Sequence, residues 1–183
     1  MFRLGSFLSH ARSSARGNGG AAAIEFALVA PIFIAIVLAT LQIAIIFFVK
    51  SYLETGAEEG ARLVLTNRAI ATANGVTSPM SQSQFKAAIC AQFNTVFSCG
   101  SLIVQLQPLP NDVTSIASLM PTFKADGTLA KGTTYTPGGG GQNMQLTVEY
   151  PWPIFGGPLG LNFATQGNGT LLMTSTQIFR VES

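Results

Sequence analysis

Glu25 is the ionisable residue whose position most needs a chemical explanation. It stands at the start of a strongly apolar stretch, because residues 26–49 include no charged residue. An acid at the centre of a membrane helix costs about 2.5 to 3.5 kcal/mol on insertion scales, and less near the interface. The sequence therefore predicts either that Glu25 has a cationic partner or that it lies at headgroup depth, where water is available.

Cys90 and Cys99 are the only cysteines, and they lie nine residues apart. In an exported domain two cysteines most simply form one disulfide, which would close a short loop and contribute about 2 to 3 kcal/mol. A metal site needs more ligands, and none are suitably spaced. We therefore expect a disulfide, with no metal and no cofactor.

Catalytic chemistry is poorly supported by the remaining polar residues. The only histidine is His10, and the acids Asp112, Asp126 and Glu149 fall in different segments. No paired acid and base and no nucleophile with a nearby imidazole can be assembled from this pattern. We predict that the protein is not an enzyme and that it has no catalytic residues.

The apolar stretch 26–49 predicts a transmembrane helix. At about 1.5 Å per residue it is long enough to cross a hydrocarbon core of about 30 Å. The first twenty residues include Arg3, Arg12 and Arg16 and no acid, and excess basic residues mark the cytoplasmic side. The chain beyond residue 20 has seven basic and eight acidic residues, which argues against nucleic-acid binding. We expect a single-pass membrane protein with a cytoplasmic N-terminus and an exported C-terminal domain; the family resemblance described below implies that this membrane is the bacterial inner membrane.

Three segments follow from composition: a basic leader over residues 1–20, a long helix over 21–70 and an exported domain over 71–183. Small and apolar residues continue at helical spacing beyond the membrane, so the helix is expected to reach about Ala69 or Ala71. Pro31 predicts a kink or local melting, although membrane helices also tolerate proline without any function. Gly56 and Gly60 form a small-residue stripe that packs either on the protein's own sheet or on another subunit.

The exported domain is predicted to be a small α+β unit. After a break at "TANGVTSP", Ser78 or Ser81 is expected to cap a short helix. The stretches "SLIVQLQP", "MQLTVEYPW" and "TLLMTSTQIFRVE" predict strands, and residues 108–142 predict a long loop that is either functional or mobile. The predicted fold class is α+β: a long N-terminal membrane-spanning helix packed on a small antiparallel sheet, with undetermined strand order.

Several motifs resemble one family of pilus proteins. Gly20, Ala21, Glu25 and Phe26 lie in "GAAAIEFALVAP", which resembles the processing site of type IV pilins. Together with "LETGAEEGARLVL", the cysteine pair and the tail "VEYPWPIFGGPLGL", this start resembles the TadE-like minor pilins or pseudopilins of the tight-adherence (Tad/Flp) pilus. Ala21 departs from the aromatic or methylated residue that often opens the mature chain of the major classes, and it favours the Tad class.

The resemblance implies cleavage after Gly20 by a prepilin peptidase, which would leave a new ammonium group on Ala21 to pair with Glu25 of a neighbouring subunit. It also implies a pilin-like fold, a non-catalytic priming, tip or scaffold role, and a possible place in the pilus. The implied partners are the peptidase, a related pseudopilin, the major pilin, platform proteins and the membrane. The alternative is an uncleaved bitopic protein whose exported domain binds an envelope component or a surface ligand.

Overall fold

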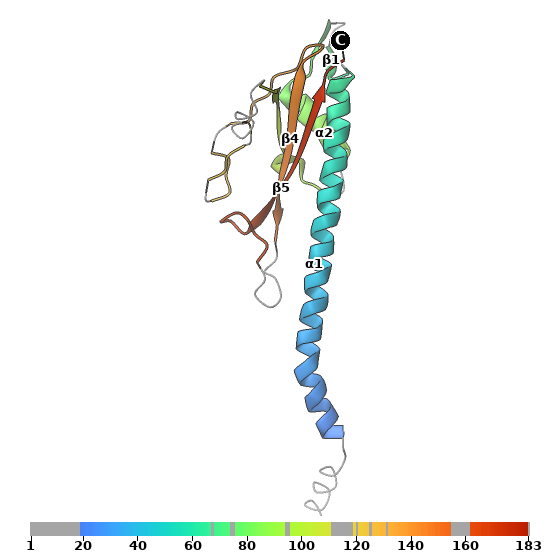
Figure 1. Cartoon of the computed structure of the whole chain (residues 1–183), viewed down its shortest axis with the longest axis vertical. Helices are drawn as coiled ribbons and strands as arrows, with labels where there is room; N and C mark the ends of the chain where they lie inside the picture. Colours follow the sequence, from blue (N-terminus) through green and yellow to red (C-terminus); the bar gives the residue numbers. More distant parts are fainter. Residues whose placement is uncertain are drawn as a thin grey trace, which may run out of the picture.

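A computed structural model describes residues 19–66, 68–73, 76–93, 96–110, 119, 121–124, 126–130, 132–154 and 162–182. A long helix, α1, lies along a three-stranded sheet, and a short helix, α2, packs between them (Figure 1). The predicted α+β class, with a long N-terminal apolar helix on a small antiparallel sheet, is confirmed. The basic leader predicted over residues 1–20 lies almost entirely outside the described residues.

Helix α1 spans Gly19–Leu65, 47 residues, and continues through Pro31 as one helix. Figure 1 shows a gentle bend of its axis in the blue part of the chain. The prediction that the helix reaches Ala69 or Ala71 is wrong. The Leu65 carbonyl accepts a hydrogen bond from the Glu182 backbone N–H at 3.0 Å, so the C-terminal tail satisfies this end of the helix.

A β-hairpin follows α1 where the sequence predicted only a break. Strand β1 (Ile70–Ala73) pairs antiparallel with β2 (Val76–Pro79), and Ile70 lies opposite Pro79. The signal was present, because Asn74 and Gly75 separate two short β-prone runs. The hairpin therefore uses residues that helical spacing had assigned to the end of α1.

Helix α2 spans Gln82–Ala91 and begins at one of the two predicted caps. Ser81 is its N-cap, and Ser81 and Gln84 form a reciprocal capping box. Its apolar face buries Phe85 and Ile89 in the core. A short 3-10 helix, η2 (Cys99–Ser101), then leads into the sheet.

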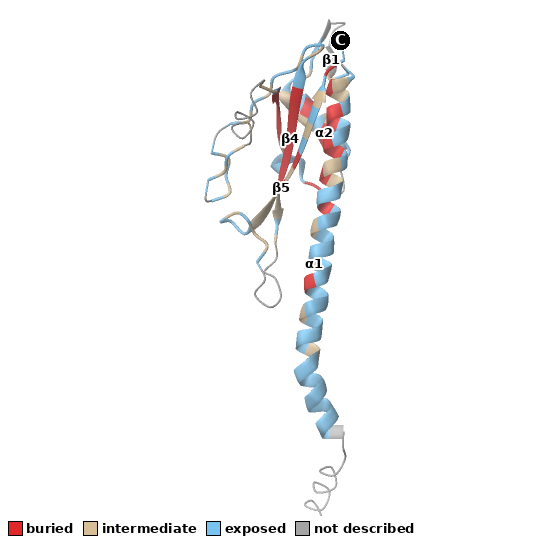
Figure 2. Ribbon diagram, viewed as in Figure 1, coloured by how far each residue is buried: buried red, intermediate tan, exposed pale blue. Residues whose placement is uncertain are grey.

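The main sheet has the antiparallel order β3-β4-β5, with β3 at Ile103–Pro108, β4 at Asn143–Pro153 and β5 at Thr170–Arg180. Alternation along β4 gives its two faces different chemistry. Met144, Leu146, Val148 and Tyr150 belong to the hydrophobic core, whereas Gln145, Thr147 and Glu149 occupy the intervening positions and are also buried. Figure 2 shows β4 as the most buried strand.

Part of the predicted loop 108–142 belongs to the sheet region. Tyr135 forms a parallel bridge to Leu106 on the edge strand β3, and Phe123 forms an antiparallel bridge to Leu129. The Leu106 N–H donates to Thr134 O at 3.0 Å, and the Thr136 N–H donates to Leu106 O at 2.8 Å. These bonds cover a section of the β3 edge that would otherwise be open.

Candidate functional site

The N-terminal half of α1 carries apolar side chains that the protein itself leaves uncovered. Phe26, Leu28, Phe33 and Phe47 have exposed fractions of 72%, 69%, 64% and 67%, and Figure 2 shows this half of the helix as almost wholly exposed. A helix that is apolar on every side requires an apolar environment. By length and composition, this helix is sufficient to cross a membrane.

The residues of the processing motif lie in the first turns of this uncovered half. Gly20, Ala21, Glu25 and Phe26 are all exposed, and among the described residues no side chain lies within 4 Å of the position that a Gly20 Cβ would take. Within the part of the chain that the structure describes, no cation forms an ion pair with Glu25. The described residues therefore leave the motif exposed.

The C-terminal half of α1 has a different environment. Val49, Leu53, Ala57 and Val64 are buried and belong to the hydrophobic core. Lys50 and Glu54 form a 4.0 Å ion pair on the exposed side, which contributes only tenths of a kcal/mol. The change from an uncovered to a packed helix therefore falls near Val49, at the end of the charge-free segment.

Gly56 and Gly60 allow α2 and the sheet to approach the backbone of α1. A Cβ atom at Gly56 would overlap the Phe93 ring, and one at Gly60 would lie 2.8 Å from Ile89 Cδ1 and 3.3 Å from Leu146 Cδ2. Of the two packing partners considered from the sequence, the structure places the protein's own α2 and sheet against this stripe. A larger side chain at either position would force these groups apart.

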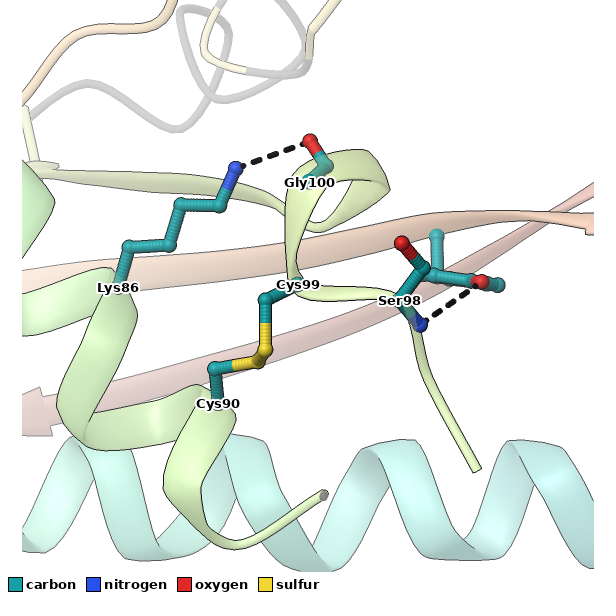
Figure 3. The surroundings of a disulfide bond; sticks show 6 residues. Lys86, Cys90, Ser98, Cys99 and Gly100 are labelled. Atoms are coloured by element: carbon teal, nitrogen blue, oxygen red, sulfur yellow. Dashed lines mark hydrogen bonds between the residues drawn. A yellow bond between two sulfur atoms is a disulfide. The ribbon is translucent and has the colours of Figure 1, made fainter. Parts of the chain in front are cut away.

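The predicted disulfide joins Cys90 at the end of α2 to Cys99 at the start of η2, with their Cα atoms 5.7 Å apart. Figure 3 shows two hydrogen bonds beside it. Lys86 Nζ donates to the Gly100 carbonyl at 3.2 Å, and the Ser98 N–H donates to the Tyr150 hydroxyl at 3.2 Å. The disulfide therefore fixes the segment between Cys90 and Cys99, which follows α2 and contacts β4 through Ser98.

Sequence reasoning missed that Glu149 is buried. Its side chain is only 2% exposed, and burial raises its pKa to about 7, although a hydrogen bond from Thr174 Oγ1 to its Oε1 at 3.3 Å opposes the rise. Alternation within "MQLTVEYPW" placed Glu149 with Gln145 and Thr147 on one face, but it could not show that this face is covered. Among the described residues, no cluster of three or more potential ligands could hold a metal ion.

An aromatic group also escaped prediction, because its members come from three distant segments. Tyr52 of α1 stacks on Phe97 at 6.0 Å between ring centroids, and Phe97 contacts Tyr150 at 4.6 Å and Trp152 at 6.3 Å. Periodicity within one segment carries no information about such contacts. The group lies where α1 passes from its packed half to its uncovered half, because Val49 begins the packed half and Tyr52 is three residues further on.

Comparison with known proteins places a family signature over both halves of α1. Residues 20–62 match the family described as TadE-like protein. No match was found among curated proteins or solved structures. The TadE-like family is a structural type of family associated with the Tad pilus, which agrees with an apolar helix presented outward from a small domain. The resemblance drawn from the sequence is thus confirmed, and the chain is TadE-like through residues 20–62.

Proposed function

We propose that this protein is a minor pilin or pseudopilin that acts as a non-catalytic priming, tip or scaffold subunit of a Tad/Flp pilus system. The observation that carries the proposal is the helix that matches the TadE-like family. Its first half is apolar and uncovered, and its second half is fixed into the domain. This arrangement suits a subunit that is stored in a membrane and assembles through its helix.

Processing would convert the membrane protein into an assembly-competent subunit. The leader is cytoplasmic, the domain is exported across the bacterial inner membrane, and the prepilin peptidase cleaves between Gly20 and Ala21. Both residues are exposed in the first turn of α1. Because glycine is a poor helix former, the Gly19–Gly20 end opens at low cost and gives the peptidase extended backbone.

Glu25 then has a defined role between subunits. Cleavage creates an α-ammonium group on Ala21, which is largely charged near neutrality because its reference pKa is about 7.7. Since Glu25 is exposed on the uncovered half of α1, a neighbouring helix can bring its own ammonium group to this carboxylate. The pair would stabilise two groups that are expensive when each is alone in lipid.

The uncovered half of α1 would make the contacts that place the subunit in the assembly. A related pseudopilin, the major pilin and the platform proteins are the proposed partners of the uncovered helix, and the peptidase is its processing partner. The exported domain, held by the disulfide and by the contacts of Gly56 and Gly60, would remain folded while the helix exchanges lipid for other helices.

The test replaces Glu25 by leucine and measures membrane insertion and pilus formation in the same cells. We expect Glu25→Leu to insert normally and to impair piliation or its own incorporation. Glu58→Leu is the matched control, because Glu58 is an exposed glutamate on the packed half of the same helix, and it should leave piliation unchanged. Normal piliation with Glu25→Leu would contradict the pairing and favour an uncleaved bitopic protein that binds an envelope component.

A further inference from the structure

The lower end of the sheet belongs to the longest charge-free part of the exported domain. No charged residue occurs between Glu149 and Arg180. This interval includes the last strand residues of β4 and most of β5. We propose that this sheet end, residues 151–154 and 163–172, rests in the headgroup and outer acyl region of the membrane that α1 crosses. The proposal rests on the membrane-anchored state of the proposed function.

The depth of the sheet end follows from how β4 and α1 run beside each other. Gly60 lies against Leu146, and eight residues earlier Tyr52 reaches Tyr150 through the Phe97 ring. The helix descends about 12 Å between these two levels, at about 1.5 Å per residue. The strand descends about 14 Å over its four residues, at about 3.4 Å per residue. The helix and the strand therefore advance by about the same distance between these two pairs of residues, so positions on β4 can be matched to positions at the same height on α1.

Extending this correspondence places the end of β4 beside the membrane segment. Pro153 is three residues beyond Tyr150, or about 10 Å further along the strand. The same descent on α1 covers about seven residues and reaches Ile45. Ile45 lies within the charge-free segment 26–49, which is about 36 Å long against a hydrocarbon core of about 30 Å. The sheet end thus lies at the boundary of the hydrocarbon region.

Direct contacts agree with this level. Ile46, Trp152 and Leu171 are partly buried and pack against the hydrophobic core, and Figure 1 shows the lower ends of β4 and β5 at the height of the middle part of α1. Trp152 lies opposite Leu171 in the register of the two strands. Tryptophan and tyrosine favour membrane interfaces, where an apolar ring meets polar headgroups. Trp152 is therefore assigned as the interfacial anchor of the sheet end.

The backbone of the sheet end is also suited to a medium with little water. The Ile154 N–H donates to Gly169 O at 3.3 Å, and the N–H groups of Thr165 and Gln166 both donate to Thr170 O at 3.0 Å. The Leu172 N–H donates to Thr165 Oγ1 at 3.0 Å. Backbone groups near lipid need such internal partners, because lipid supplies none. Internal bonding and the absence of charge together favour lipid as the occupant.

Trp152 is the only tryptophan in the chain, so intrinsic fluorescence reports on this one position. The full-length protein would be placed in phosphatidylcholine nanodiscs, either with ordinary lipid or with lipid brominated near the headgroup end of the acyl chain. We expect brominated lipid to remove most of the Trp152 emission and aqueous acrylamide to remove little. Strong acrylamide quenching, or resistance to both quenchers, would overturn the proposal.

A second variant moves the probe away from the membrane. Trp152→Phe combined with Phe123→Trp places the tryptophan in the long loop, where we expect acrylamide to quench and brominated lipid to have little effect. Co-elution with the nanodisc reports separately on the α1 anchor. A protein that co-elutes while Trp152 is open to acrylamide contradicts only the sheet-end contact, whereas a protein that fails to co-elute contradicts the anchored state itself.

Discussion

The two halves of α1 belong to one continuous helix but meet opposite environments. From Phe26 to Phe48 no side chain is charged, and the domain leaves most of the large apolar side chains uncovered. From Val49 to Leu65 one face is buried against α2 and the sheet, while the other carries the Lys50–Glu54 pair. One continuous helix therefore has two environments: its first half exposes apolar side chains, and its second half packs into the protein's own core.

The difference shows which half can change partners. The packed half is held by side chains that fit around Gly56 and Gly60, so losing these contacts would expose the core. Among the described residues of the uncovered half, Ile46 packs against the core, whereas Phe26, Leu28 and Phe33 are exposed. Lipid and another apolar helix are equivalent environments for such exposed apolar side chains. The same substitution should therefore lower folding stability when it is made in the packed half, and should change membrane insertion or assembly when it is made in the uncovered half.

The largest expected effect comes from shortening a buried leucine. Leu53 is fully buried, whereas Leu41 is 54% exposed on the uncovered half. Leu53→Ala should lower the free energy of unfolding by about 2 to 5 kcal/mol, because it removes packed methyl groups and leaves a cavity. Leu41→Ala should change it little. Urea unfolding of the full-length protein in detergent measures both, and equal losses would contradict the division of the helix.

The pH dependence of stability should arise in the domain, at Glu149. Burial raises its pKa to about 7 from 4.5, so between these pH values the folded protein keeps a proton that the unfolded chain releases. The free energy of unfolding should therefore fall as pH rises through this window, by up to about 3 kcal/mol, and stay low above it.

Thermal unfolding across this pH range tests the assignment to Glu149. Glu149→Gln should remove most of the decline and make the protein more stable than the wild type above pH 7. Glu58→Gln, at an exposed position on α1, should retain the wild-type profile. A decline of the same size in Glu149→Gln would place the titrating group elsewhere.

Removal of the disulfide should weaken the domain without affecting the uncovered half of the helix. Cys90→Ser combined with Cys99→Ser opens a loop whose ends lie nine residues apart, and we expect a loss of about 2 to 3 kcal/mol in unfolding free energy. Insertion into membranes should not change. A variant that unfolds like the wild type would show that α2 and η2 hold this connection without the bond.

The smallest expected effect on stability comes from replacing one glycine by alanine in each half of α1. Gly56→Ala places a methyl group against the Phe93 ring and should lower stability by about 1 to 3 kcal/mol through overpacking. Gly20→Ala meets open space and should leave unfolding unchanged while slowing cleavage by the peptidase. Gel mobility and urea unfolding separate the two results. Loss of stability in Gly20→Ala, without a loss in Gly56→Ala, would contradict the assignment of Gly56 to the packed half and Gly20 to the uncovered half.

The sequence predicted the features that depend on local patterns. Alternation located all three strands of the main sheet, and the Ser81 cap was one of two candidates for the start of α2. The end of α1 was misplaced because Leu65 is satisfied by the Glu182 N–H, a contact from the far end of the chain. The burial of Glu149 was missed for a related reason, since coverage of a sheet face depends on segments distant in sequence.

The most direct test of the central claim is the N-terminal sequence of the protein recovered from membranes of cells with and without their prepilin peptidase. We predict a chain that begins at Ala21 only when the peptidase is present, because the uncovered half of α1 would then be a processed pilin helix. A chain that begins at Met1 or Phe2 under both conditions would contradict this account and leave α1 as a plain membrane anchor.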